Sequence, residues 1–275
     1  MLSKITPLIL TFNEAPNIRR TLEKLTWAKE ILVVDSFSTD ETLESARSFP
    51  RVCIVQRKFD SFAGQCNFGL QQIRSEWALS LDADYVLSDE LNRELAELKP
   101  SPGIAGYRAN FNYCVYGHPL RGSLYPPRTV LYRRDKARYR DEGHGHRVQI
   151  EGPVRMLSGR INHDDRKPLE RWFGEQVRYA GQEAEYLLSS KEHKAGSKEQ
   201  GARSRELNMP DRIRKKIILA PALVFFFTLL GKGLILDGWP GWYYVFQRTL
   251  AEILLSLKLI EMKLGNWKTE ARRVK

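Results

Sequence analysis

Short apolar runs alternate with amphipathic stretches through the first third of the chain. Uncharged runs of this kind are typical of buried strands, whereas apolar residues that recur every third or fourth position indicate helices. The predicted strands are 5–12, 31–34, 52–56 and 77–82, and the predicted helices are the stretch after Pro16, 43–49 and 64–75. This alternation predicts an α/β fold with a mostly parallel sheet and flanking helices.

The pattern becomes less regular after the fourth predicted strand. Residues 107–113 alternate in polarity as a strand at an exposed sheet edge would, and 130–134 and 154–163 are two further predicted strands. A loop rich in glycine, proline and tyrosine is predicted at 117–127. A long amphipathic helix, 169–188, is expected to close this domain.

The C-terminal part combines high charge with apolar segments. We expect an α/β domain at 1–188, a charged linker or loop at 189–216 and a helical extension at 217–275. Residues 217–231 carry no charge, and their proline and glycine interruptions favour a re-entrant or interfacial helix over one that spans the bilayer. The aromatic run 239–244 suits the level of the lipid headgroups. We therefore expect the extension to associate with a membrane.

A heptad stripe runs along the last predicted helix. Its apolar residues recur at spacings of four and three and are Phe246, Leu250, Ile253, Leu257, Ile260 and Leu264. Such a stripe could pack on its own domain, on a second copy of the chain in a homo-oligomer, or on lipid. Packing on its own domain is the simplest of these three interpretations.

Charge is distributed unevenly along the chain. The net charge of +11 consists of −3 over residues 1–100 and +14 over residues 101–275. A basic half suits nucleic acid, an anionic membrane surface or phosphorylated substrates. The apolar segments beside it favour the membrane. Nucleic acid is disfavoured because the basic residues are not interleaved with a stacking platform.

The cysteines and the N-terminus indicate a cytosolic setting. Cys53, Cys66 and Cys114 show no C-x-x-C spacing, so neither a zinc site nor a disulfide framework is indicated and reduced thiols are expected. The first apolar run, 5–10, is too short for a signal peptide and is predicted as a strand.

An acidic pair, Asp82 and Asp84, ends the fourth predicted strand. Such a pair offers hard oxygen ligands where an open α/β sheet commonly binds its ligands, which suits a divalent cation that carries a diphosphate. Two more polar segments follow strands, Thr11 to Glu14 and Asp35 to Asp40. In a parallel sheet all three would emerge at one carboxyl edge and form a single crevice.

The three segments together resemble the family 2 glycosyltransferases, which have a GT-A, Rossmann-like fold. In that family the first strand ends in Thr-(Phe/Tyr)-Asn-Glu, the second in V-V-D-x-G-S-T-D-x-T and the fourth in D-x-D. Within it the chain is most similar to bacterial lipopolysaccharide-core β-glucosyltransferases, through Gln65 and Asn67 before the acidic pair and Tyr125 to Arg128 after it. Phe37 departs from the family, which usually has glycine there.

The resemblance implies a nucleotide-sugar donor, with UDP favoured. Phe12 would lie against the uracil ring, and Asp35 would accept a hydrogen bond from the imide N–H of the base, a donor that cytosine lacks. Asp84 would bind Mg²⁺ or Mn²⁺ that bridges the two phosphates, with Asp82 beside it and His163 as a third ligand. The implied nucleotide-binding set is Thr11, Phe12, Glu14, Asp35, Asp40, Gln65, Asn67 and Asp82.

Three of these assignments have simpler structural alternatives. Asp40 could cap the following helix as readily as it could contact a ligand. A histidine that ends a strand, such as His163, is usually structural. In the region that would cover the crevice, the chain also has Arg121, Arg128, Arg133 and Arg134. These arginines could grip the diphosphate or an anionic acceptor, but for most of them a solvated basic face is the simpler interpretation.

Inversion at the anomeric carbon also needs a base to take the proton from the acceptor hydroxyl. The relatives tend to carry a His-Glu pair, whereas in this chain Arg147 occupies the place expected to hold glutamate. We expect Glu142 to be the base, with Asp141 and His146 as the next candidates. A metal site formed by His144 and His146 is the competing interpretation of this segment.

These features predict a membrane-associated, metal-dependent, inverting glycosyltransferase. Its donor would be a UDP-hexose, and its acceptor a lipid-linked or glycolipid molecule of cell-envelope polysaccharide or lipopolysaccharide synthesis, at the cytoplasmic face of a bacterial inner membrane. The missing His-Glu base leaves a catalytically silent nucleotide-sugar-binding or scaffold protein as the alternative. A nucleotidyltransferase is disfavoured because no Gly-rich, Lys/Arg-bearing loop follows the first strand.

Overall fold

In the computed structural model the chain forms two units. We call them the sheet unit (Met1–Lys167) and the helical unit (Pro168–Lys275). The structure describes the backbone of residues 1–142, 145–192, 214 and 217–273, and the side chains of these residues except 142, 145, 146, 189–192 and 265–273. The boundary follows residue 167 rather than the predicted residue 188, because helix α5 (Leu169–Glu192) packs on helix α8 (Gly238–Arg273).

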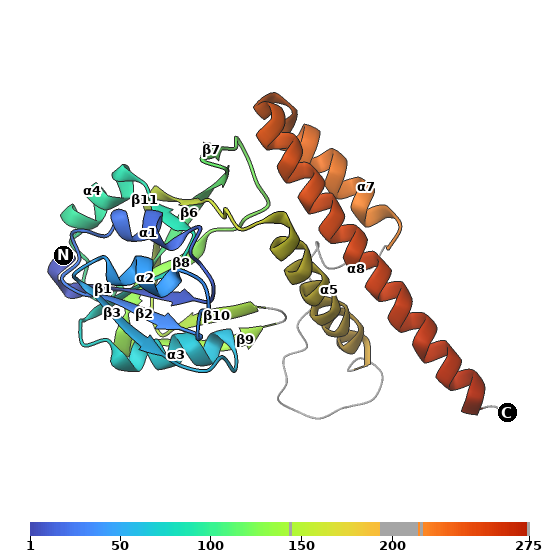
Figure 1. Ribbon diagram of the computed structural model, residues 1–275, viewed down its shortest axis with the longest axis horizontal. Coiled ribbons are helices and arrows are strands. Elements are labelled where there is room, and N and C mark those ends of the chain that lie inside the picture. Colours follow the sequence, from blue (N-terminus) through green and yellow to red (C-terminus); the bar gives the residue numbers. More distant parts are fainter. Residues whose placement is uncertain (143–144, 193–213, 215–216, 274–275) are drawn as a thin grey trace. The chain divides into compact units, whose positions relative to one another are not determined.

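One nine-stranded mixed sheet organises the sheet unit (Figure 1). The order along it is β3-β2-β1-β4-β8-β6-β11-β5, and β7 pairs with β6. Its strands are β1 (Ile5–Thr11), β2 (Ile31–Asp35), β3 (Val52–Gln56), β4 (Trp77–Asp82), β5 (Tyr85–Leu87), β6 (Gly106–Val115), β7 (His118–Pro119), β8 (Arg128–Arg133) and β11 (Val154–His163). The first four strands along the sheet are parallel, as the sequence predicts, whereas β8 and β5 run antiparallel to their neighbours.

Helices cover both faces of the parallel part of the sheet (Figure 1). These helices are α1 (Ile18–Glu23), α2 (Thr42–Arg47), α3 (Phe62–Gln72) and α4 (Asp89–Glu97), and a separate hairpin is formed by β9 (Ala137–Glu142) and β10 (Gly145–Ile150). One core joins α1, α2 and α4 to Ile9 and Val33, and the other joins α3 and β9 to Leu8 and Val34. Because successive strand residues enter opposite cores, these strands appear in the sequence as uninterrupted apolar runs.

The predicted edge position of residues 107–113 is wrong. β6 pairs with β8 on one side and with β11 on the other, so it lies inside the sheet. Its alternation arises because Tyr107, Ala109 and Phe111 enter the core while Arg108 is exposed. A strand with one open face therefore has the same pattern as an edge strand.

In the described residues the helical unit contains α5 and α8 and, between them in the sequence, a bent segment (Figure 1). The bent segment contains α7 (Leu219–Phe226), a π-helical turn η3 (Phe227–Gly231) and a 3₁₀ turn η4 (Leu234–Asp237). α5 and α7 both pack on α8. The predicted charged linker, 189–216, lies almost entirely outside the described residues.

No single helix within the described residues is long and apolar enough to cross a membrane. Leu219–Gly231 and Leu234–Leu264 meet the requirements of length and composition only as a pair, and the two are bent by 66°. The break falls where Gly233 takes a left-handed φ of 70°, a conformation that glycine adopts without steric cost.

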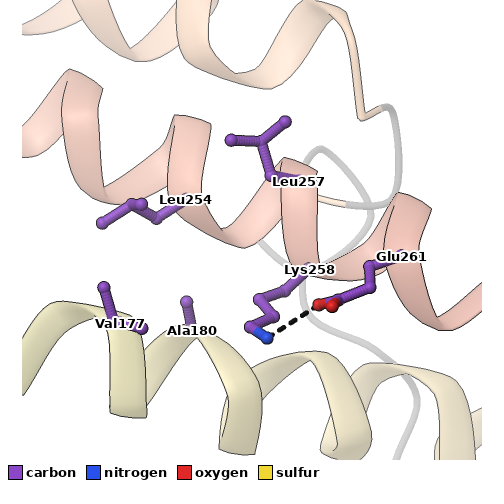
Figure 2. A pocket seen from close by; sticks show the side chains of 6 residues that line it. All are labelled: Val177, Ala180, Leu254, Leu257, Lys258 and Glu261. Atoms are coloured by element: carbon purple, nitrogen blue, oxygen red, sulfur yellow. Dashed lines mark hydrogen bonds and ion pairs between the residues drawn. The ribbon is translucent and has the colours of Figure 1, made fainter.

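Within the described residues most of the heptad stripe of α8 is exposed, and Leu250 is half-buried, so the choice among its three interpretations stays a prediction. Phe246 and Leu257 are each 57% exposed, and Leu264 is 54% exposed. The buried side of α8 instead contains Tyr244, Val245, Glu252, Leu255, Ser256 and Leu259. A groove of about 300 Å³ between α5 and α8 opens beside Leu257, with the Lys258–Glu261 ion pair at its rim (Figure 2).

Candidate active site

Six strands deliver their carboxyl ends to one edge of the sheet. β1 to β4 run parallel to one another, and β6 and β11 run in the same direction because the antiparallel β8 lies between β4 and β6. This edge therefore carries the segment after Thr11, Asp35, the Asp82–Asp84 pair and His163. The start of β8, at Arg128, lies at the same edge. The predicted meeting of the three polar segments is confirmed.

Asp35 ties the ends of β1 and β2 together. It is fully buried, and its Oδ1 accepts hydrogen bonds from Thr11 Oγ1 at 2.8 Å and Ser38 Oγ at 2.5 Å. Its Oδ2 accepts from Ser38 N at 2.9 Å and Gln56 Nε2 at 3.1 Å. A carboxylate offers about four acceptor positions, and here all are occupied. Recognition of the base by Asp35 stays a prediction that would need these bonds to rearrange.

Asp40 holds the start of α2 in place. Its Oδ1 accepts a hydrogen bond from Thr42 N at 3.0 Å and another from the Thr42 hydroxyl, and its Oδ2 accepts from Ala15 N at 3.2 Å. Asp40 lies one residue before Glu41, the N-cap of α2, so these contacts join it to the first residue of the helix and link the loop after β2 to the loop after β1.

The amides of Gln65 and Asn67 connect α3 to its surroundings. Gln65 is buried, and its Nε2 donates to Ser36 Oγ at 2.8 Å. Asn67 exchanges two hydrogen bonds with the backbone of Tyr139 on β9, at 3.0 and 2.9 Å. In this structure Gln65 positions the loop after β2, and Asn67 positions the hairpin at the carboxyl edge of the sheet.

Asp84 and His163 form a largely buried pair, with 9% and 15% of their side chains exposed. The distance between His163 Nε2 and Asp84 Oδ2 is 3.1 Å. Burial alone would raise the pKa of Asp84, but the charge of His163 and its hydrogen bond outweigh burial and lower that pKa, while Asp84 raises the pKa of His163 against the effect of burial. Asp84 Oδ1 and His163 Nδ1 are buried with no hydrogen-bond partner in the described part of the chain.

A carboxylate and an imidazole are both ligand types that divalent cations accept. Asp84 Oδ2 and His163 Nε2, which face each other at 3.1 Å, are the two atoms that a shared ion would bind in place of their hydrogen bond. Asp82, at the end of β4, does not complete a cluster, because no three His, Cys, Asp or Glu side chains within the described ranges are placed to hold a metal together. The pairing of Asp84 with His163 agrees with their predicted proximity. Their roles as ligands stay predictions.

Aromatic rings surround His163. The ring of Tyr125 lies at 4.5 Å from it, Tyr113 at 4.9 Å and Tyr85 at 5.4 Å, measured between centroids. The hydroxyls of Tyr85 and Tyr125 are hydrogen-bonded, and the Arg128 guanidinium lies 4.9 Å from the Tyr125 ring centroid. The Tyr125 to Arg128 segment thus covers the Asp84–His163 pair and brings a cation near it.

A network around Lys167 was not predicted from the sequence. Lys167 Nζ lies 2.9 Å from Glu14 Oε1 and 3.5 Å from Asp165 Oδ2, and the Asn17 amide donates to both carboxylates. Burial raises the pKa of Glu14 to about 7 although Lys167 opposes it. The run of charged residues 164–167, directly after His163, is the sequence feature that could have predicted this network.

Asp164 anchors the same segment to α1. It is buried, and its carboxylate accepts hydrogen bonds from Arg20 Nη1 at 2.7 Å, Arg166 Nε at 3.0 Å and the backbone N–H of Gly117 at 3.0 Å. The segment after β11 is therefore held rigidly at the carboxyl edge, which fixes His163 beside Asp84.

The candidate bases lie on the β9–β10 hairpin. Asp141 is exposed, and its Oδ1 accepts a hydrogen bond from Ala63 N, in the first turn of α3, at 3.1 Å. The side chains of Glu142 and His146, and all of His144, lie outside the described residues. The identity of the base stays a prediction.

The sheet and its carboxyl edge define a GT-A-like α/β protein. The chain belongs to glycosyl transferase family 2, whose family model matches residues 8–150. The match includes β1 from residue 8 onward, all of β2, β3 and β4, and the β9–β10 hairpin.

Curated relatives share part of their length with this chain. The Rhizobium meliloti lipopolysaccharide core biosynthesis glycosyltransferase LpsC is 31% identical over 142 residues, which are 49% of this chain and 53% of LpsC. An uncharacterized glycosyltransferase of Rickettsia bellii is 38% identical over 93 residues, 34% of this chain and 31% of that protein. The matches therefore span a third to a half of these relatives.

Solved structures also align with the chain. Staphylococcus aureus TarS 1-349 in complex with UDP-GlcNAc is 14% identical, and the alignment covers 95% of this chain and 92% of TarS with a TM-score of 0.45. Glucosyl-3-phosphoglycerate synthase from Mycobacterium tuberculosis is also 14% identical, with 68% and 79% covered and a TM-score of 0.44.

Proposed function

We propose that this protein is an inverting, metal-dependent glycosyltransferase that moves a hexose from a UDP-sugar to a lipid-linked or glycolipid acceptor. The observation that carries the proposal is the largely buried Asp84–His163 pair at the carboxyl edge, in which a carboxylate oxygen and an imidazole nitrogen face each other at 3.1 Å. Membership of glycosyl transferase family 2 supports sugar transfer as the reaction.

Asp84 and His163 would hold Mn²⁺ or Mg²⁺, with Asp82 near by. When bound, the ion would offset negative charge on the departing diphosphate. The chain itself contributes an exposed ring at the end of β1, Phe12, and a cation near the acidic pair, Arg128. The tyrosines around His163 keep water from this part of the site, which strengthens its electrostatic interactions.

The proton of the acceptor hydroxyl would pass to a base on the β9–β10 hairpin. Glu142 remains our first candidate, followed by Asp141 and His146. The hairpin is fixed beside the crevice, because Asp141 and Asn67 both bond it to α3.

The helical unit supports a membrane-bound acceptor. Exposed apolar patches of this extent usually mark interaction surfaces. The large apolar residues exposed at 40% or more from α7 to α8 are Leu219, Leu223, Phe226, Phe227, Leu230, Ile235, Leu236, Trp239, Phe246, Leu257, Ile260 and Leu264. An anionic membrane surface, at the cytoplasmic face of a bacterial inner membrane, would cover them and attract the basic half of the chain. The similarity to LpsC supports lipopolysaccharide core synthesis as the setting.

Release of UDP from UDP-hexoses tests the activity. The purified full chain is incubated with UDP-glucose, UDP-galactose or UDP-GlcNAc and Mn²⁺, and UDP is measured with and without EDTA. We expect slow donor hydrolysis that EDTA abolishes, because the ion stabilises the leaving group. UDP binding without release from any donor would instead support the silent nucleotide-sugar-binding or scaffold protein, which the missing glutamate at Arg147 favours.

A further inference from the structure

Phe37 has a backbone conformation that its side chain disfavours. Its φ is 62°, and Asn13 and Tyr116 are the other residues besides glycine with positive φ in the described part of the chain. In this left-handed region Cβ crowds the following carbonyl oxygen, which asparagine tolerates better than bulky residues do. All three residues directly follow, or lie within two positions of, a strand that ends at the carboxyl edge.

Hydrogen bonds on both sides of Phe37 impose this conformation. Ser36 N donates to Thr11 O at 2.9 Å, and Ser38 donates to Asp35 through both its N–H and its hydroxyl. Thr11 thus holds the backbone before position 37 and buried Asp35 holds the residue after it. Glycine would adopt this conformation without strain, so the turn itself does not explain a phenylalanine.

Core packing does not explain the ring either. Phe37 is 53% exposed and belongs to neither core of the sheet unit. Phe12, at the end of the neighbouring strand, is 51% exposed. The last residues of the two strands, Thr11 and Asp35, are direct register partners. Two half-exposed aromatic rings therefore follow adjacent strands at the edge where the polar side chains are bonded to one another.

We propose that Phe37 is a nucleobase-binding residue, which together with Phe12 supplies the apolar surface on which the base of the donor stacks. This rests on the proposed function and assigns a further contact to its donor site. Backbone strain of this kind is often retained at binding sites, and aromatic stacking provides affinity for any base. Stacking also suits a site in which Asp35 has no acceptor position left for the base.

Calorimetric titration with UDP and with pyrophosphate, both with Mn²⁺, tests the assignment. Phe37→Ala and Phe37→Gly both remove the ring, so both should bind UDP about tenfold more weakly than the wild type and bind pyrophosphate unchanged. Phe37→Gly should melt about 1 to 3 °C above Phe37→Ala, because only glycine accepts the turn without strain. Met156→Ala is the control, since Met156 is 49% exposed near the opposite end of β11.

The outcomes separate this inference from the function on which it rests. Wild-type affinity for UDP in both Phe37 variants would overturn the inference and leave the proposed donor intact. An equal loss for UDP and pyrophosphate would also overturn it, because the defect would not act through the base. No binding of UDP by the wild type would overturn the proposed function and the inference with it.

Discussion

The two units use their side chains in opposite ways. In the sheet unit apolar residues fill two cores, and the polar residues at the carboxyl edge bond to one another, as Asp35 and Asp164 do. In the helical unit the stripe of α8 is exposed, while Glu252 is buried against Arg214 at 3.1 Å. The sheet unit thus bonds most of its edge residues to one another and leaves Asp84 Oδ1 and His163 Nδ1 without partners in the described part of the chain. The described part of the helical unit leaves large apolar side chains exposed.

Among the tests of this comparison, replacement of Asp84 should have the largest effect, a loss of activity at the polar site of the sheet unit. Asp84→Asn removes a charge from the proposed ion site, so we expect kcat for donor hydrolysis to fall by about a thousandfold. Asp89→Asn is the matched control, because Asp89 is 75% exposed on α4. Initial rates of UDP release measure both. Activity of Asp84→Asn within a few-fold of the wild type would remove Asp84 from the site.

Replacing a leucine by alanine should destabilise the protein far more in the sheet unit than on the exposed stripe of the helical unit. Leu79→Ala, in the core of the sheet unit with no exposed surface, should lower the free energy of unfolding by about 2 to 5 kcal/mol. Leu257→Ala, on the exposed stripe, should change it by less than about 0.5 kcal/mol. Urea denaturation of the full chain provides the comparison. Similar losses for both variants would show that the stripe is covered in solution.

The pH dependence of stability should reveal Glu14. Its pKa is raised from 4.5 to about 7 in the folded protein, chiefly by burial, so the folded state holds this proton more tightly than the unfolded state. The resulting stability is fully present below pH 4.5 and is lost as the pH rises through 7. As the pH rises from 4.5 to 8, the free energy of unfolding of Glu14→Gln should therefore increase by about 3 kcal/mol relative to that of the wild type. Parallel urea-denaturation profiles of the two proteins against pH would contradict this prediction.

Charges on the stripe should weaken membrane binding. Leu257→Glu should reduce binding to vesicles that contain anionic phospholipid about tenfold, because a carboxylate replaces an apolar contact. Val154→Glu, at an exposed apolar position of the sheet unit, should bind like the wild type. Co-sedimentation with vesicles measures both. Leu257→Glu could instead bind the vesicles as the wild type does. If analytical ultracentrifugation then showed that the substitution dissociates a dimer formed by the wild type, the stripe would be assigned to contact with a second copy of the chain.

The sequence predicts the sheet well because its signals are local. Continuous apolar runs identify strands that are covered on both faces, and the polar segments after them identify the carboxyl edge. The proximity of Asp84 and His163 was implied by the resemblance to the family rather than by this pattern, and the two side chains lie 3.1 Å apart.

Other features depend on contacts that no local pattern records. The Lys167–Glu14 pair joins residues 153 positions apart. The interior position of β6 depends on how the chain returns through β8 and β11, which its own alternation does not reveal. The heptad stripe of α8 has a period that suits an intramolecular, intermolecular or lipid interface equally well.

Binding of Mn²⁺ tests the central claim most directly, that the carboxyl edge holds a metal-dependent donor site. Calorimetric titration of Mn²⁺ into the full chain with UDP present should show one ion per chain in the wild type. The same titration should show no such binding in Asp84→Asn and a greatly weakened affinity in His163→Gln. Unchanged Mn²⁺ binding in both variants would contradict the account.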